Sequence, residues 1–219
     1  DWILSHMQPE EAARIREVLE DPIAALTADD KKKLWELRKN LSTTKAGLLP
    51  HFLLSVDWRD PKKVAIALDM MYRWARPMPE EALNLLDAKF PDPRIRAYAV
   101  QCLNAFDDNE LQSYMLQLVQ GLKFEPFHDS ALARFLLRRA LSNPPTVGHA
   151  FFWYLRAEVH VPSVQERFQA YIDIYLRNCG SHRAALGHQM LVMSRLEAVA
   201  QGVQREPTKE ARLEYLRGL

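Results

Sequence analysis

Proline and glycine divide this sequence into short stretches whose apolar residues recur every three or four positions. The chain of 219 residues holds 13 prolines and 7 glycines, and the prolines fall mostly between the apolar stretches. Because proline interrupts helix and sheet interiors, this placement indicates a series of helices separated by short turns. Strand-like alternation is scarce, and no Asn-Gly or Asp-Gly pair separates two β-branched runs. The sequence therefore predicts an all-α fold.

Several helix starts can be identified by a capping residue. Thr27 and Asp30 are three positions apart, so the hydroxyl and the carboxylate can each accept a backbone N–H at the start of one helix. We expect further N-caps at Asp92, Asp108 and Asp129, each of which precedes an amphipathic stretch. Other helices are predicted at residues 9–20, 45–56, 61–75, 79–89, 147–159, 163–178, 183–204 and 208–217.

The connections between these helices are short, so successive helices should pack antiparallel. Paired units of irregular spacing predict a HEAT/armadillo-like right-handed α–α superhelix that folds cooperatively over residues 8–204. Residues 205–219 are expected to form a C-terminal helix or linker, and residues 1–7 are consistent with a tag or linker remnant. The proline-rich segment 143–147 is predicted to be a stiff surface loop.

Composition excludes several classes of protein. Lys and Arg number 29 against 28 Asp and Glu, so no overall positive field attracts nucleic acid or an anionic membrane. The two cysteines, Cys102 and Cys179, lack a CxxC partner and are predicted to be buried and inert in a reducing compartment. No apolar run approaches the roughly 18 residues of a membrane span. We expect a soluble, cytoplasmic protein without direct membrane insertion.

Catalytic motifs are absent from the sequence. There is no phosphate-binding GxxxxGK[ST] or GxGxxG, no HRD or DFG triplet, and no HExxH. His149 and His160 flank an aromatic helix, where packing and a local hydrogen bond are favoured over a general-base role. The sequence thus predicts no catalytic, cofactor-binding or metal-binding residues in this chain. A hydrolytic or metal site assembled from distant residues has the least support.

Five runs between positions 111 and 160 form a specific pattern. They are LQLVQ at 116–120, LKFE at 122–125, FLLRRAL at 135–141, GH at 148–149 and FWYLRAE at 152–158. By these motifs the chain resembles the helical accessory (PIK) domain of a phosphoinositide 3-kinase catalytic subunit, over about residues 21 to 180. The absence of an insertion after Phe124-Glu125 resembles the class I members.

The resemblance implies a non-catalytic scaffold that positions the lipid kinase domain of a parent phosphatidylinositol 3-kinase and relays the binding of regulatory partners. In that family, ATP and magnesium bind to a kinase domain that lies outside this chain. The implied partners are the other domains of the parent and a regulatory subunit, and the parent is recruited to membranes. The alternative from the residues alone is a free-standing HEAT-like adaptor without a kinase parent.

The resemblance also implies a candidate surface for a regulatory partner. In some class I members, acidic or polar residues at the start of one helix meet basic residues of a phosphotyrosine-reading regulatory subunit. The matching positions here are Ala25, Ala28 and Asp29, followed by Asp30. Alanine supplies no charge for an ion pair, so only Asp29 and Asp30 can serve in this way. The competing interpretation is a simple capped helix start.

Overall fold

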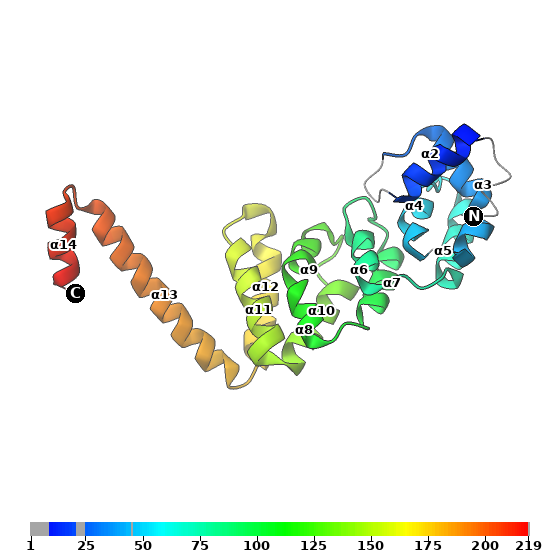
Figure 1. The fold of residues 1–219 in the computed structure, drawn as a ribbon. Helices are drawn as coiled ribbons and strands as arrows, with labels where there is room; N and C mark the ends of the chain where they lie inside the picture. The colour runs from blue at the N-terminus through cyan, green and yellow to red at the C-terminus, as the bar shows by residue number, and fades with distance from the viewer. Residues whose placement is uncertain (1–8, 21–24, 45, 219) are drawn as a thin grey trace. The chain divides into compact units, whose positions relative to one another are not determined.

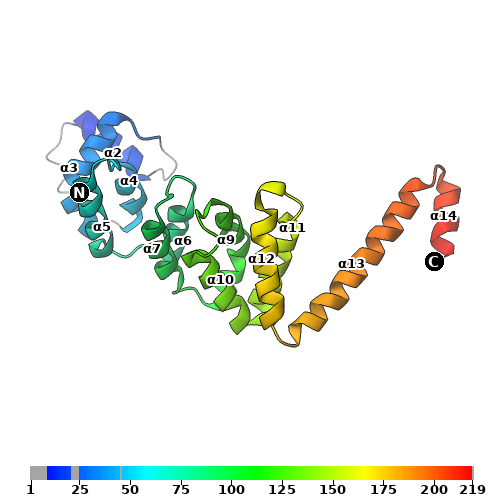
Figure 2. The ribbon, with the colours of Figure 1, turned by 180° about the vertical axis from the view of Figure 1, so that it is seen from behind.

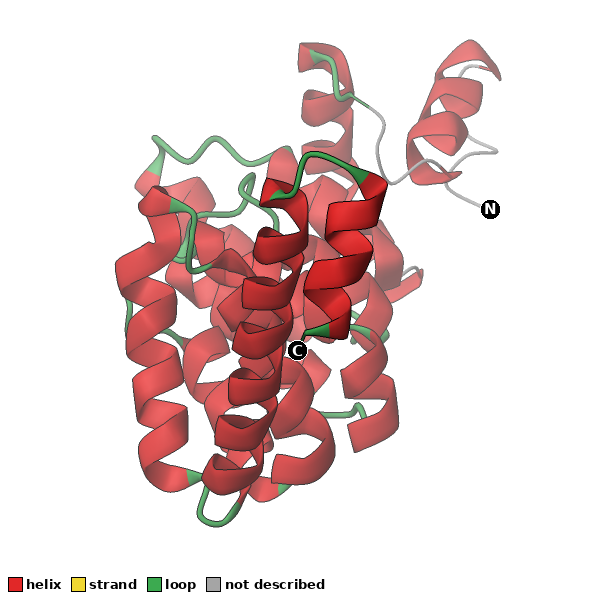
Figure 3. Cartoon of the chain, turned by 90° about the vertical axis from the view of Figure 1, so that its left-hand side faces the viewer, coloured by secondary structure: helices red, strands yellow, loops and turns green. Residues whose placement is uncertain are grey.

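The computed structural model of the chain describes residues 9–20, 25–44 and 46–218. All regular structure in these residues is helical, without a strand (Figure 3). The predicted all-α fold is therefore confirmed, while the HEAT/armadillo-like right-handed superhelix stays a prediction. The predicted tag or linker remnant at residues 1–7 lies outside the described residues. No described helix is both long and apolar enough to cross a membrane.

The described helices, labelled in Figure 1, belong to two compact units, Asp1–Leu136 and Leu137–Leu219. The first unit contains α2 (Pro9–Glu20), α3 (Ala28–Thr44), η1 (Ala46–Leu48), α4 (Leu49–Leu54), α5 (Pro61–Arg73), α6 (Pro79–Ala82), η2 (Leu83–Leu86), α7 (Pro93–Leu103), α8 (Asp108–Ser113), α9 (Met115–Gly121) and η3 (Leu122–Phe124). Helix α10 (Ala131–Ser142) runs from the first unit into the second. The second unit continues with η4 (Pro144–Gly148), α11 (His149–Glu158), α12 (Pro162–Asn178), α13 (His182–Arg205) and α14 (Lys209–Arg217).

Aromatic packing organises the core of the first unit around α4. The ring of Phe52 is fully buried and stacks on Trp74, with the ring centroids 4.9 Å apart. It also stacks on Trp35 of α3, with the ring centroids 6.0 Å apart. These contacts join α3, α4 and the end of α5, because each ring comes from a different segment.

In the second unit, α11 and α12 pack side by side, as both Figure 1 and Figure 2 show. Phe151 and Phe152 of α11 and Phe168 and Tyr175 of α12 are buried, and the rings of Phe151 and Tyr175 meet edge to face with their centroids 6.1 Å apart. Gly148 permits this close approach, because a Cβ there would lie 2.1 Å from the Tyr175 hydroxyl. This glycine is therefore required by the packing of its neighbours.

Two of the predicted N-caps are confirmed. Thr27 and Asp30 exchange the predicted hydrogen bonds at the start of α3. The carboxylate of Asp92 accepts the backbone N–H of Arg94 at 2.8 Å at the start of α7, and Pro93 occupies the first helical position. Proline suits that position because its missing N–H would have no partner within the helix.

The other two predicted N-caps are wrong by one residue in opposite directions. Asp107, and not Asp108, caps α8 by accepting the N–H groups of Asn109 and Glu110, both at 2.8 Å. At α10 the hydroxyl of Ser130 accepts the N–H of Ala133 at 3.2 Å, while the Asp129 carboxylate instead pairs with the Arg134 guanidinium. In each case two capping residue types are adjacent, so sequence alone does not select between them.

The predicted stiff loop at residues 143–147 is also wrong, because Pro144–Gly148 forms a π-helical turn. The N–H of Gly148 donates to the carbonyl of Asn143 at 3.0 Å, which closes the wide turn directly before α11. The two prolines lie at the start of this turn, where a helix does not need their missing N–H groups.

Candidate functional site

The four positions matched to a regulatory surface lie immediately before and within the first turn of α3. The backbone N–H of Thr27 donates to Oδ2 of Asp30 at 2.9 Å, and the N–H of Asp30 donates to the Thr27 hydroxyl at 3.1 Å. Two N–H groups that the helix itself cannot pair are satisfied in this reciprocal way. Asp30 is therefore part of the cap that begins the helix.

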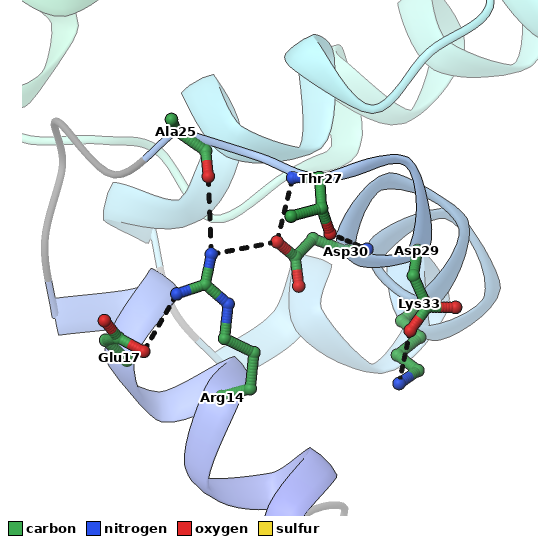
Figure 4. Close-up of polar contacts among 7 residues, drawn as sticks. All are labelled: Arg14, Glu17, Ala25, Thr27, Asp29, Asp30 and Lys33. Carbon is green, nitrogen blue, oxygen red and sulfur yellow. Dashed lines mark hydrogen bonds and ion pairs between the residues drawn. The ribbon is translucent and has the colours of Figure 1, made fainter.

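A guanidinium from α2 completes this arrangement. Arg14 approaches Asp30 with Nη2 at 3.1 Å from Oδ2, and the same nitrogen donates to the carbonyl of Ala25 at 3.3 Å (Figure 4). Its Nη1 donates to the Glu17 carboxylate at 2.8 Å. One side chain of α2 thereby holds both the start of α3 and Ala25, which lies two residues before the cap.

Asp30 is buried, with 4% of its surface exposed. Burial alone would raise the pKa of its carboxyl, but hydrogen bonds from Arg14 and from Thr27 outweigh that effect and hold the pKa below the ordinary value of 3.8. The carboxylate is charged, paired and covered. A basic partner would compete with Arg14 for this buried carboxylate, so Asp30 is less suited to a partner contact than an exposed acid.

The other three positions are exposed. Ala25 and Ala28 present small apolar side chains, and Asp29 directs its carboxylate away from Asp30 (Figure 4). Its Oδ2 lies 2.7 Å from the Lys33 ammonium one turn along α3, and 67% of the Asp29 side chain is exposed. An exposed pair at this spacing contributes only a few tenths of a kcal/mol to helix stability, so Asp29 can exchange this contact for another at little cost.

The exposed charges at the start of α3 carry a positive surplus. Lys31 and Lys32 are both exposed and follow the single exposed acid, Asp29, while Asp30 is neutralised by Arg14. A strongly basic partner would therefore meet no surplus of acidic charge on these residues.

The cap itself follows from sequence spacing, but the role of Arg14 does not. Arg14 and Glu17 lie 16 and 13 positions before Asp30, and neither was predicted as a partner from the sequence. A buried acid at the third helical position signals that a cation is needed. The choice among the basic residues of α2 depends on how α2 packs, which spacing does not specify.

The described residues hold no cluster suited to catalysis by metal or thiolate. No group of three or more His, Cys, Asp or Glu side chains among them is arranged to hold a metal ion. Cys102 and Cys179 are buried as predicted, and burial raises the pKa of the Cys102 thiol. His149 makes a local hydrogen bond with Trp153, which donates its indole N–H to Nε2 at 3.1 Å, as the packing interpretation requires.

Comparison of the sequence with known proteins identifies the family of this chain. The family model of the phosphoinositide 3-kinase family accessory domain, or PIK domain, matches residues 5–187. Phosphatidylinositol 3-kinase 2 of Dictyostelium discoideum is 42% identical over 92% of this chain, which corresponds to 11% of the length of that protein. Phosphatidylinositol 3-kinase 1 of the same organism is 42% identical over 84% of the chain and 12% of its own length.

Phosphatidylinositol 3-kinase 3 of Dictyostelium discoideum is 36% identical over 94% of the chain, again 12% of its own length. The chain thus spans about a ninth of the length of the curated relatives it matches. The match of the family model over most of the chain shows that this protein belongs to the phosphoinositide 3-kinase accessory-domain family.

Proposed function

We propose that this chain is the non-catalytic scaffold domain of a phosphatidylinositol 3-kinase catalytic subunit, where it positions the lipid kinase domain. The observation that carries the proposal is the match over residues 5–187, together with relatives that bear the name of phosphatidylinositol 3-kinases and are far longer than this chain. In this proposal ATP and magnesium bind elsewhere in the parent protein, which works in the cytoplasm and is recruited to membranes.

The packing of the first unit supports a positional role. Stacked rings join α3, α4 and α5, and buried hydrogen bonds from Arg96 of α7 reach the carbonyls of Leu86 and Gly121. Closely packed interiors deform little, so a unit of this kind can keep the elements attached to it at a fixed spacing.

The direct test is a lipid phosphorylation assay with the purified chain and, in parallel, with the full-length parent protein. The proposal expects transfer of phosphate from ATP to phosphatidylinositol by the parent and none by the chain alone. Turnover by the pure chain would overturn it. A natural stop codon directly after Leu219 would instead support the free-standing adaptor.

The relay of regulatory binding is the finer part of this proposal, and it involves Ala25, Ala28 and Asp29. Asp29 carries the one exposed acidic charge among the positions matched to the partner surface. We expect Asp29→Lys to weaken a basic phosphotyrosine-reading partner in a titration with the parent, because it places one more positive charge beside Lys31 and Lys32. Asp57→Lys, at an exposed position after α4, serves as the control. Equal affinity of the wild type and Asp29→Lys would exclude this surface.

A further inference from the structure

A groove lies where α5 and α7 begin, two helices of the first unit that lie next to each other in Figure 1 and Figure 2. The residues that line it come from the loop before α5, the loop before α7 and the first turn of α7, and they are Trp58, Lys89, Phe90, Pro91, Asp92 and Ile95. Its volume is about 440 Å³, which is typical of a small binding pocket. This Trp58 groove can therefore take one large side chain of a bound molecule.

The walls of the Trp58 groove are held in place by hydrogen bonds within the chain. The indole N–H of Trp58 donates to the carbonyl of Leu53 in α4 at 3.2 Å. The buried guanidinium of Arg96 donates to the carbonyls of Asp87 and Phe90 at 3.2 and 3.4 Å, which ties down the loop before α7. Because these contacts already exist without a bound molecule, binding orders few side chains of the groove.

The groove offers apolar surface to a partner. Phe90 and Ile95 are 4% and 1% exposed, so they contribute the buried part of the lining. Trp58 is 40% exposed, and Pro91 beside Phe90 is exposed as well. A side chain that covers Trp58 and Pro91 removes apolar surface from water, which favours binding. The lining is therefore suited to an aromatic or large aliphatic side chain.

Three basic side chains accompany this apolar lining. Lys89 lines the groove, Arg59 follows Trp58, and Lys62 lies in the first turn of α5. All three residues are exposed. Within the described residues, none of their side chains makes a hydrogen bond or an ion pair. Their positive charges are therefore available to a partner.

The acidic side chains in the same segments already have partners. Asp60 accepts two N–H groups of the first turn of α5 at 2.9 and 3.4 Å, and Asp92 pairs with Arg94 and caps α7. The partial positive charge of each helix start offsets such a capping carboxylate. Asp57 and Asp87 each accept the backbone N–H two residues ahead, at 3.2 and 2.9 Å. The charges left without a partner at the groove are thus positive.

We propose that the Trp58 groove binds an acidic segment of a partner protein. The segment places one large apolar side chain against Trp58 and Pro91, and its carboxylates lie beside Arg59, Lys62 and Lys89. The proposal goes beyond the scaffold function, because it adds a second docking surface on the first unit. It also differs from the surface at the start of α3, where the expected partner is basic.

The shape of the groove favours a protein segment over an anionic membrane. Phe90 and Ile95 are nearly covered, so a single side chain that enters the groove can reach them, whereas a membrane surface contacts protruding groups. Tryptophan at a membrane interface directs its polar edge to the headgroups, but the indole N–H of Trp58 is bonded to Leu53.

The test is an NMR titration of the nitrogen-15-labelled chain with a synthetic peptide in which one phenylalanine is flanked on both sides by glutamates. The observed signal is the indole N–H of Trp58, identified by its loss in Trp58→Phe. We expect a saturable shift with this peptide and none when lysines replace the glutamates. Alanine in place of the phenylalanine should weaken binding about tenfold, because less apolar surface is covered. No saturable shift with the first peptide, or equal binding of the lysine peptide, would overturn the proposal.

Charge reversal at the groove tests the role of the basic side chains. Lys89→Glu should weaken binding of the acidic peptide about tenfold, because it replaces an attraction by a repulsion. Lys209→Glu, at an exposed position of α14 in the second unit, changes the net charge equally and should keep the wild-type affinity. Neither side chain has a partner within the described residues, so both variants should fold, which circular dichroism checks. Wild-type affinity in Lys89→Glu would refute the assignment.

The membrane alternative is measured by sedimentation with vesicles of phosphatidylcholine and phosphatidylserine. We expect the wild type and Lys89→Glu to sediment with these vesicles to the same extent. If the wild type sediments and Lys89→Glu does not, while the acidic peptide leaves the Trp58 signal unshifted, the groove belongs to an anionic membrane and the proposal is wrong.

Discussion

At the scale of single residues, Arg96 carries a positive charge into the core of the first unit. Its side chain is 1% exposed, and Nε lies 2.7 Å from Oε1 of the equally buried Glu125. Its Nη1 and Nη2 donate to the carbonyls of Leu86 and Gly121 at 2.9 and 3.0 Å. This one side chain therefore pairs with a carboxylate and two carbonyl groups that come from three different segments of the chain.

Replacing Arg96 with methionine should destabilise the chain by about 3–5 kcal/mol, because it leaves Glu125 as a buried charge without its partner. The measurement is the free energy of unfolding in urea. Adding Glu125→Leu to Arg96→Met should recover part of the loss, since the unpaired charge is then removed. A double variant that is as unstable as the sum of both single variants would contradict this explanation.

Arg94 offers a matched control two positions earlier in α7. It pairs with Asp92 at 2.6 Å, but 58% of its side chain is exposed. Arg94→Met should therefore cost at most about 1 kcal/mol, as is typical of exposed ion pairs. If Arg94→Met and Arg96→Met lower the free energy of unfolding equally, burial of the ion pair does not determine how much its loss destabilises the chain.

Asp30 gives the contact between α2 and α3 a dependence on pH. Its folded-state pKa lies below 3.8, so the folded chain binds fewer protons than the unfolded chain, and the stabilisation is present above that value and lost as pH falls below it. Asp30→Asn should lower the free energy of unfolding by about 1 kcal/mol at pH 7, and by less at pH 3. Asp29→Asn is the control, and an effect of equal size from it would contradict the distinction between the buried and the exposed acid.

At the scale of the elements, helix positions could be predicted because each helix start and each apolar face is encoded within a few residues. Thr27 and Asp92 mark their helices correctly. The break of one amphipathic stretch into α8 and α9 at Tyr114 was not predicted, since the ring of Tyr114 stacks on Phe106 at 5.1 Å, a contact outside the helix itself. Likewise, Arg14 and Arg96 find their partners through tertiary packing, which helical periodicity does not specify.

Gly202 sets the packing of α14 on α13. It lies inside α13, and a Cβ there would be 2.1 Å from the hydroxyl of Tyr215. Gly202→Ala should strengthen α13 as a helix, because alanine is the better helix former, and yet displace the Tyr215 ring and release α14. Hydrogen exchange of the amides of α14 should become faster in this variant.

Gly187→Ala separates these two effects. Gly187 also lies within α13, but an added Cβ there meets no atom within 4 Å. This substitution should stabilise α13 by about 1 kcal/mol without faster exchange in α14. If both variants leave hydrogen exchange in α14 unchanged, the contact between Gly202 and Tyr215 does not hold α14 against α13.

At the scale of the whole molecule, the chain is a helical member of the accessory-domain family that matches a small fraction of much longer kinases. The candidate regulatory surface was only partly predictable from sequence. The spacing of Thr27 and Asp30 predicted the cap. It did not predict that Asp30 is buried or that Asp29 forms an ion pair with Lys33. In the proposed scaffold function, the activity of the parent protein depends on the integrity of the buried core of this chain.

The measurement that tests this claim most directly is the lipid kinase activity of the full-length parent carrying Arg96→Met or Arg94→Met. The account predicts that Arg96→Met lowers the rate of phosphatidylinositol phosphorylation in parallel with the loss of helical-domain stability, while Arg94→Met keeps the wild-type rate. A parent protein that retains full activity with Arg96→Met, although its helical domain is measurably destabilised, would contradict it.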